Sequence, residues 1–397
     1  MLKMLVGYTS EADNAELALA EVLERADIEN KLLKNSVGLL FCNLDFIDSG
    51  VVNALCGRLP FKVIGCTTQG LATNDLSAQF MLSLVVLTSD TVEFSVGLSA
   101  SLTVMGSSHL LRSEEEAEER LRALYTRTAA SLAGRPSMML VFQPLLLNLP
   151  GDAVTSVLDR VSEGVPIFGS IALDMPTKIR SPQIIHNGLP YADRLTILLL
   201  SEAASPRFFL KTISPQNSRS AIITRAEGNK LLSINNMPAI KHLEKLGIAE
   251  QGRFSPALFF MATIRSPGGR TSTCVFYDVT PEGHLICGNT PETGGILEMG
   301  AITGRNVLES AAELIEEIRT ACFEEESFRN ALLFFACFSR SLDLMDATEE
   351  SEFIRKELQS TVFPYVFAYS GGEFCPVTEN GRLENRFQQH SIIACLL

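Results

Sequence analysis

The chain repeats one unit of strand, helix, strand, turn and strand, and this repeat is what most constrains its fold. The first copy begins at the apolar strand Gly38–Phe41, the second at Ser137–Phe142 and the third at Ala331–Phe338. Corresponding strands of the first two copies stand roughly 100 to 113 residues apart, a spacing too long for a solenoid. We therefore predict an α/β protein whose mixed sheets are built from these repeated units.

Each copy turns sharply after its second strand. The three turns read GCTTQG at Gly65–Gly70, GSIALD at Gly169–Asp174 and SGGEFCP at Ser370–Pro376. Glycine-rich connections between strands can present backbone amides to a ligand. Glu373 occurs only in the third turn, so we expect a polar ligand to bind there. A Pro/Asn/Gly-rich loop is expected to follow this turn, before the final strand at Ile392–Leu397.

A polar stretch at Ser214–Gly228 predicts the boundary between two domains. Residues 1–214 would hold two copies of the unit, and residues 215–397 would form the second domain. The segment after the boundary predicts a strand at Leu231–Ile234, an Asn-Asn turn, and a helix that begins at Pro238 and ends at Gly247.

Local signals predict where several helices begin. Asp13-x-x-Glu16 and Ser113-x-x-Glu116 are typical of capping boxes, and Asp152 is placed to cap the helix of the second copy. Clusters of acidic residues, including Glu349–Glu352, are expected to lie on solvated helix faces.

Charge and composition exclude several classes of function. The formal net charge of −13 and the pI near 5.0 argue against a nucleic-acid-binding surface. Apolar runs are shorter than the roughly 18 residues that span a bilayer, so no membrane insertion is expected. Nine cysteines without a C-x-x-C pair or an N-terminal signal sequence indicate reduced thiols and a cytoplasmic protein.

Four motifs in order resemble those of a known family. They are the GCTTQG turn, the hairpin LLSINNMPAI, the pair Cys337-x-x-Arg340, and Tyr369-Ser370-x-Gly372-Glu373 with Pro376 after it. The chain thereby resembles FIST-domain proteins, with a FIST N-terminal region at about 38–210 and a C-terminal region at about 226–397. It departs from the family where Gln388 replaces a typical histidine, with His390 two positions on.

The resemblance implies an intracellular sensory module that binds a small ligand. Such modules act on signalling partners such as histidine kinases or cyclic-dinucleotide enzymes. Some free-standing members are nitric oxide sensors that bind haem b. Because haem without covalent attachment needs one axial histidine, the candidate metal ligands are His186, at a strand end, and His390, at the start of the last apolar strand.

The third copy supplies the candidate ligand-binding residues. Arg340 presents a planar fork that suits a carboxylate, and Glu373 suits an amine, so the pair could hold an amino-acid-like ligand. Alternatively, Arg340 and Glu373 bridge each other and stabilise the strand ends. Cys337, Tyr369, Ser370 and Gly372 complete the predicted set.

An enzyme is the competing class of function. The run AYSGG at Ala368–Gly372 is similar to a nucleophile elbow, which requires a helix directly after the serine. Here Phe374, Cys375 and Pro376 follow instead, so we predict a protein without catalytic activity. The alternatives are a hydrolase that uses Ser370 and a thiol enzyme that uses Cys66.

Overall fold

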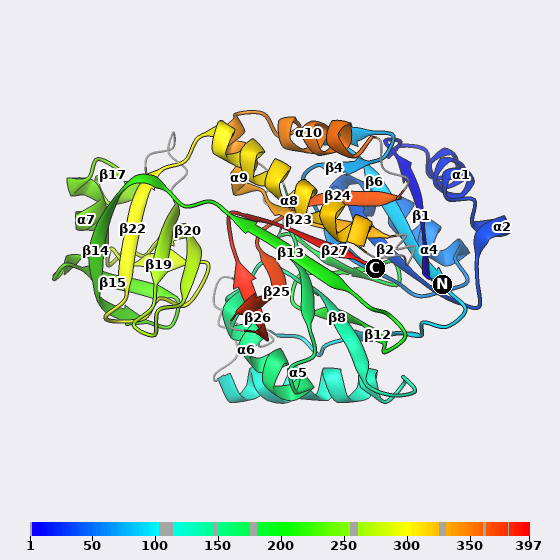
Figure 1. Ribbon diagram of the computed structural model, residues 1–397, viewed down its shortest axis with the longest axis horizontal. Coiled ribbons are helices and arrows are strands. Elements are labelled where there is room, and N and C mark those ends of the chain that lie inside the picture. The colour runs from blue at the N-terminus through cyan, green and yellow to red at the C-terminus, as the bar shows by residue number, and fades with distance from the viewer. Residues whose placement is uncertain are drawn as a thin grey trace.

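A computed structural model describes residues 2–102, 114–146, 149–174, 181–254, 261–324, 331–359, 363–379 and 381–397. It shows a body of three mixed sheets covered by helices, with a separate β-barrel at one side (Figure 1). The predicted α/β class is confirmed. Among the described residues, no helix is long and apolar enough to cross a membrane.

The body consists of three repeats with the same order of elements. The first contains β1 (Leu2–Thr9), α1 (Ala15–Ala26), α2 (Ile28–Lys31), β2 (Asn35–Cys42), α3 (Leu44–Asp48), α4 (Val51–Arg58), β3 (Val63–Thr67), β4 (Leu71–Thr73), β5 (Ser77–Ala78) and β6 (Leu82–Ser89). The second contains β7 (Phe94–Leu98), α5 (Glu114–Ala129), β8 (Pro136–Gln143), α6 (Gly151–Ser162), β9 (Ile167–Ile171), β10 (Ile184–His186), β11 (Leu189–Tyr191) and β12 (Thr196–Ser201). The third contains β13 (Arg207–Thr212), α8 (Gly304–Glu324), β23 (Leu332–Cys337), α9 (Ser339–Leu344), α10 (Glu349–Leu358), β24 (Tyr365–Ser370), β25 (Glu373–Glu379), β26 (Arg382–Gln388) and β27 (Ser391–Leu396).

Each repeat forms a four-stranded sheet and donates a hairpin to another repeat. The sheets run β1-β6-β2-β3, β7-β12-β8-β9 and β13-β27-β23-β24, and the last two strands of each are parallel. Hairpin β4–β5 pairs with β24, β25–β26 with β9, and β10–β11 with β3. The three repeats are therefore linked in a closed cycle.

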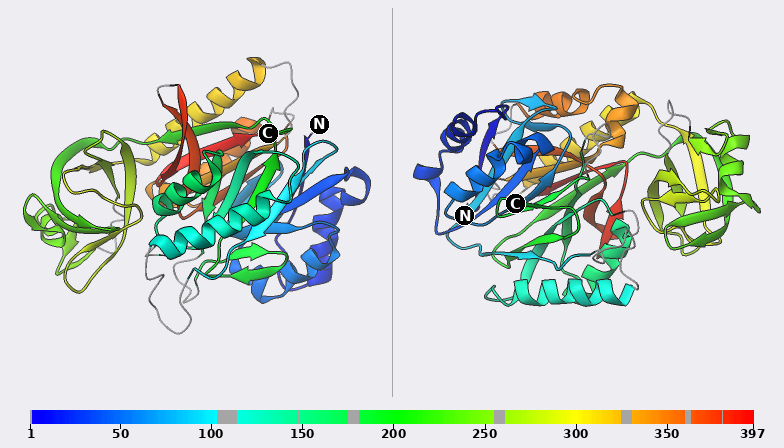
Figure 2. Two further views of the ribbon diagram at one scale, coloured as in Figure 1. Left: turned by 90° about the horizontal axis from the view of Figure 1, so that it is seen from below. Right: turned by 180° about the vertical axis from the view of Figure 1, so that it is seen from behind.

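The inner faces of the three sheets share one apolar core. Phe41, Phe142 and Phe335 come from β2, β8 and β23, and their ring centroids are 5.6 to 6.0 Å apart. The outer faces are covered by α1 and α4, by α5 and α6, and by α8 and α10 (Figure 2). The predicted unit is present in each repeat. Each repeat also begins with a strand and a helix that the sequence analysis did not include in the unit, namely β1 and α1, β7 and α5, and β13 and α8.

The barrel is inserted into the third repeat between β13 and α8. Its elements are β14 (Gln216–Glu227), β15 (Lys230–Ile234), β16 (Met237–Pro238), α7 (Ala239–Lys245), β17 (Ala249–Glu250), β18 (Arg253–Phe254), β19 (Met261–Arg265), β20 (Thr271–Val279), β21 (Leu285–Cys287) and β22 (Ile296–Ala301). The order β14-β22-β19-β20-β21-β15 closes on itself because β15 also pairs with β14. The predicted strand and helix at 231–247 appear as β15 and α7. The barrel has an apolar core of its own.

The sheets group the chain differently from the predicted division at residue 214. Strands β23 to β27 share sheets with strands that precede residue 214, whereas residues 216–301 form the barrel. Figure 1 shows the barrel joined to the body by the segments before β14 and after β22. The predicted domains 1–214 and 215–397 stay a prediction.

Three local expectations differ from the structure. The expected loop after Glu373 is the hairpin β25–β26, in which Pro376 is tolerated because β9 pairs only with Glu373 and Phe374. The N-cap of α1 is Asn14 rather than Asp13. Pro150 stands at the N-cap of α6, so Asp152 lies in the first turn of this helix. Ser113 lies outside the described residues.

Gly169 is a position where a methyl group is expected to cost stability. A Cβ there would lie 2.0 Å from the carbonyl oxygen of Val141, and φ is +150°. We expect Gly169→Ala to lower the free energy of unfolding by about 2 to 4 kcal/mol, measured by urea denaturation. The control Gly164→Ala, also at positive φ but in open space, should cost only about 1 kcal/mol. Equal losses would contradict the role of the close approach.

Candidate functional site

The turns of the three repeats meet where the sheets exchange their hairpins. In each contact, a backbone N–H of one repeat donates to a carbonyl at another repeat's turn or hairpin start. The pairs are Thr67 to Gln183 at 2.8 Å, Ile171 to Gly372 at 2.9 Å and Tyr369 to Gly70 at 3.2 Å. The third turn is thereby fixed against both other repeats.

Glu373 is a fully buried carboxyl group at the end of the third turn. Its two oxygens accept hydrogen bonds from the hydroxyl groups of Ser370 at 2.5 Å and Ser391 at 2.6 Å. Burial raises the pKa of Glu373 to about 8, although both serine hydroxyls act in the opposite direction. The raised pKa favours the protonated form at neutral pH, in which the carboxyl O–H donates to one of the two serine hydroxyls instead of accepting from it.

Arg340 is also fully buried, and it pairs with Glu350. Its Nε and Nη2 lie 2.9 and 2.5 Å from Oε1 of Glu350, and Nη2 also donates to the Ser310 hydroxyl. Tyr369 donates to the other oxygen of Glu350 at 3.3 Å. The alternative bridge between Arg340 and Glu373 is thus wrong, because each group has closer partners. Glu350, expected on a solvated face, is instead fully buried.

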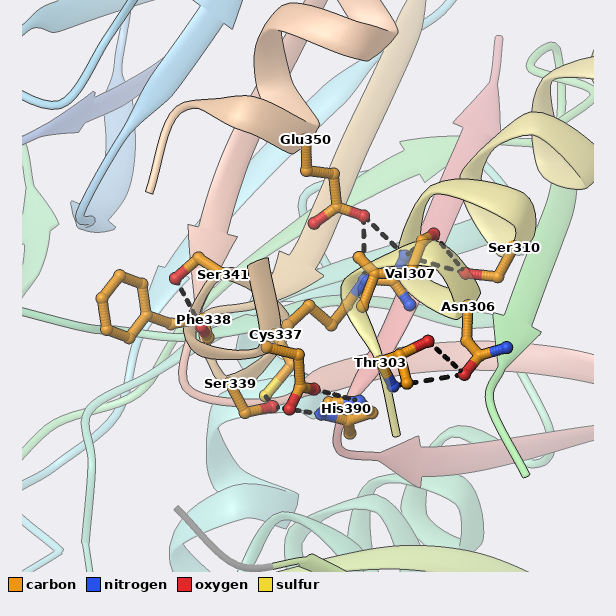
Figure 3. Close-up of polar contacts among 12 residues, drawn as sticks. Thr303, Asn306, Val307, Ser310, Cys337, Phe338, Ser339, Ser341, Glu350 and His390 are labelled. Atoms are coloured by element: carbon orange, nitrogen blue, oxygen red, sulfur yellow. Dashed lines mark hydrogen bonds and ion pairs between the residues drawn. The ribbon is translucent and has the colours of Figure 1, made fainter. Parts of the chain in front are cut away.

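His390 lies in a polar group beneath α9 (Figure 3). Its Nδ1 is 2.8 Å from the Ser339 hydroxyl, which is 3.1 Å from the sulfur of Cys337. Its Nε2 is 3.1 Å from Oδ2 of Asp343, a distance that suits an ion pair, but the atoms are not aligned for a hydrogen bond. Burial lowers the pKa of His390, although Asp343 acts in the opposite direction.

Three buried polar atoms in this cluster have no hydrogen-bond partner among the described residues. They are Nη1 of Arg340, Nε2 of His390 and Oδ2 of Asp343, of which the last two lie 3.1 Å apart and face each other. Buried polar groups are almost always hydrogen-bonded, so such atoms require an explanation. Together they offer a cationic donor, an imidazole nitrogen and an anionic acceptor. Sequence reasoning missed Asp343, although its spacing of three residues from Arg340 on one helix was a usable signal.

The barrel contacts the body at the third turn. The Tyr277 hydroxyl of β20 donates to the carbonyl oxygen of Gly371 at 3.2 Å and accepts from Nε2 of Gln389 at 2.5 Å. The backbone N–H of Val275 donates to Oε1 of Gln389 at 2.9 Å. A second contact joins the N–H of Thr290 to the carboxylate of Asp152 at 2.7 Å, outside the third turn.

Neither candidate nucleophile, Ser370 or Cys66, has the surroundings that its predicted reaction requires. Ser370 is followed by strand β25 rather than by a helix, which confirms that the turn is not a nucleophile elbow. Its hydroxyl donates to Glu373. Cys66 lies in the inner core, where burial raises the pKa of its thiol to about 12.

His186 and His390 lie in different sheets, so they do not form one site. His390 does not fit an axial haem ligand, because it is fully buried and both ring nitrogens face polar groups. Nδ1 of His186 is 3.1 Å from the hydroxyl of Thr196, and burial lowers its pKa to about 4. Among the described residues, no group of three or more His, Cys, Asp or Glu side chains is arranged to hold a metal ion.

Comparisons with known proteins place the chain in a family. Among the solved structures that match are "T. maritima PurL complexed with ATP" at 9% identity and "Structure of PurLQS from Thermotoga maritima" at 10% identity. Both alignments cover 100% of this chain, and they cover 71% and 72% of the matched chains, respectively. Both TM-scores are 0.19, which is too low to support an argument. No curated protein matches. The family model of the FIST N domain matches residues 36–237, just over half of the chain and outside the polar cluster of the third repeat. The chain therefore belongs to the FIST family.

Proposed function

We propose that the chain is a sensor that binds a small zwitterionic ligand, such as an amino acid, beneath α9 of the third repeat. The observation that carries this proposal is the buried Nη1 of Arg340, which has no hydrogen-bond partner among the described residues and lies in the same cluster as the pair of His390 and Asp343. FIST membership supports a sensory, ligand-binding role in signalling.

The chemistry of these atoms favours a ligand with charges of both signs. Nη1 of Arg340 donates to a ligand carboxylate, whereas Nε2 of His390 faces Asp343 at 3.1 Å and orients that side chain's carboxylate. Oδ2 of Asp343 accepts from an ammonium group. A simple anion would be repelled by Asp343, whereas a zwitterion satisfies both groups. Asp343 suits the ammonium better than Glu373, which is held by two serines and carries a proton at neutral pH.

The third turn connects this ligand site to the barrel. Cys337, the last residue of β23, contacts Ser339 beside His390. Tyr369, near the end of β24, contacts Glu350 beside Arg340. Gly371, in the turn that follows β24, contacts Tyr277 of the barrel. A ligand that shifts α9 would therefore change how the barrel is held. The proposed partner is a histidine kinase or a cyclic-dinucleotide enzyme.

Asp343 should contribute to binding only when the ligand carries an ammonium group. In calorimetric titrations with a panel of small amino acids, we expect Asp343→Asn to weaken binding about 10- to 100-fold, because an ionic hydrogen bond is lost. The matching carboxylic acids without the amino group should bind no more weakly to this variant than to the wild type. The exposed control Glu309→Gln should change neither.

Two outcomes would contradict the proposal. One is that no member of the panel binds, and the other is that Asp343→Asn weakens both kinds of ligand equally. For the partner, a bound ligand should change the autophosphorylation rate of a co-encoded kinase, measured with radiolabelled ATP. An unchanged rate with saturated protein would exclude control of that kinase.

Haem binding at His186 is a second candidate function. His186 is neutral at pH 7, and its neighbour Asn187 lines a groove of about 370 Å³ together with Leu59, Pro60 and Phe61. A bound haem b would supply an iron centre that binds nitric oxide. Protein purified with added haem should then show a stoichiometric Soret band that His186→Ala removes and His390→Ala retains. Absence of that band would rule the candidate out.

A further inference from the structure

The third turn joins the buried carboxyl group of Glu373 to the contact with the barrel. Gly371, whose carbonyl accepts from Tyr277, precedes Glu373 by two residues. Gln389, which donates to the same tyrosine, precedes Ser391 by two residues, and Ser391 donates to Glu373. Gly371 and Gln389, which hold Tyr277, are therefore close in sequence to Glu373 and to its hydrogen-bond donor Ser391.

The surroundings of Glu373 are poorly suited to a negative charge. The groups that face it are Cys337 from β23, Tyr277 from β20, Arg340 from α9 and Cys375 on its own strand. Burial raises the pKa values of both thiols and of the phenol, so these groups stay neutral near pH 8. The charge of Arg340 is paired with Glu350. An ionised Glu373 would rely mainly on two serine hydroxyls, which makes entry of water favourable.

Water can reach Glu373 most easily from the side of the barrel. On its other sides the carboxyl group is enclosed by the ladder of β25 with β9 and by the apolar core. On the barrel side, the contact consists of a few hydrogen bonds from Tyr277 and Val275. Away from this contact, the barrel is joined to the body by the hydrogen bonds of Thr290 to Asp152 and by the two chain segments seen in Figure 1, which can act as hinges.

We propose that the barrel is a proton-controlled arm, whose contact through Tyr277 with Gly371 and Gln389 opens when Glu373 loses its proton. This goes beyond the proposed ligand sensor, since no small-molecule ligand is required. The proton is the signal, and the position of the barrel is the response. His390 does not provide this switch, because burial lowers its pKa, whereas the switch requires a group whose pKa is raised.

Small-angle X-ray scattering of the whole chain, without ligand, tests the proposal. We expect the radius of gyration of the wild type to increase reversibly between about pH 6.5 and about pH 9.5. Glu373→Gln should stay compact at both pH values, and Tyr277→Phe should be expanded at both. The control Glu384→Gln, an exposed position on the same hairpin, should expand as the wild type does. A wild type of constant size, a Glu373→Gln variant that still expands, or a Tyr277→Phe variant that stays compact at high pH would overturn the proposal.

Infrared spectroscopy provides a second measurement that does not need a variant. The absorption band of a protonated carboxyl group should disappear from the wild type with a midpoint near the value of about 8 for Glu373. The same midpoint should govern the change in radius of gyration. Midpoints that differ by more than about one pH unit would overturn the proposal, even if Glu373→Gln fails to fold. Failure of ligand binding would leave both measurements unaffected, so the two proposals fail separately.

Discussion

Arg340→Met is expected to lower the free energy of unfolding by about 3 to 5 kcal/mol, because it leaves the buried carboxylate of Glu350 without its cation. Both side chains are fully buried, and Oε1 of Glu350 takes two of the hydrogen bonds of the guanidinium group. Urea denaturation followed by circular dichroism measures the loss. An exposed ion pair should contribute far less, so Arg305→Met on α8 should change stability by less than about 1 kcal/mol.

A double variant separates the loss of the pair from the loss of packing. Removing both charges in Arg340→Met with Glu350→Leu should restore most of the stability that Arg340→Met loses, because no buried charge then remains. Full loss in the double variant would show that the side chains matter through their shape and their contacts with Ser310 and Tyr369. An Arg340→Met variant as stable as the wild type would contradict the buried ion pair itself.

The stability of the wild type is expected to fall as pH rises between about 4.5 and 8. Burial raises the pKa of Glu373 in the folded protein from 4.5 to about 8, so the folded state holds a proton that the unfolded state releases. The stabilising effect is complete below pH 4.5 and is lost as pH rises through about 8. The shift corresponds to at most about 5 kcal/mol.

The comparison with Glu373→Gln isolates this contribution. The variant keeps a neutral, hydrogen-bonding side chain at every pH, so the difference between its free energy of unfolding and that of the wild type should change by several kcal/mol between pH 5 and 9. Glu384→Gln, at an exposed position, should run parallel to the wild type. Parallel curves for Glu373→Gln and the wild type would show that Glu373 does not titrate in this range.

Local sequence patterns predicted the central strands of each repeat and the turn that follows the second of them. Apolar runs such as Leu332–Cys337 are buried on both faces and read as strands without ambiguity. The exchange of hairpins was not predictable, because β4 and β10 are three residues long and their sequences do not specify which edge they pair with. The barrel was missed because it is inserted between β13 and α8 of the third repeat, and its residues were therefore assigned to the same predicted domain as that repeat.

The candidate site was predicted in part. Arg340, Glu373 and Ser370 were grouped by motif reasoning and His390 was predicted separately as a haem ligand, but the partners of these residues were not predicted. Glu350 belongs to a run of acidic residues that is typical of a solvated face, and only the packing of α10 against α8 places it inside. Their roles in ligand binding, with those of Cys337, Tyr369 and Gly372, stay predictions.

The cyclic exchange of hairpins has a consequence for synthesis of the chain on the ribosome. Leu71 of β4 pairs with Ala368 of β24, 297 positions later, so the first hairpin has no partner until nearly the whole chain has emerged. Until then, the edge of β9 and the unpaired hairpin β4–β5 are open to pairing with other chains. Nascent chains truncated before β24 should therefore depend on chaperones, because the last 35 residues supply the strands β24 to β27 that complete two of the three sheets.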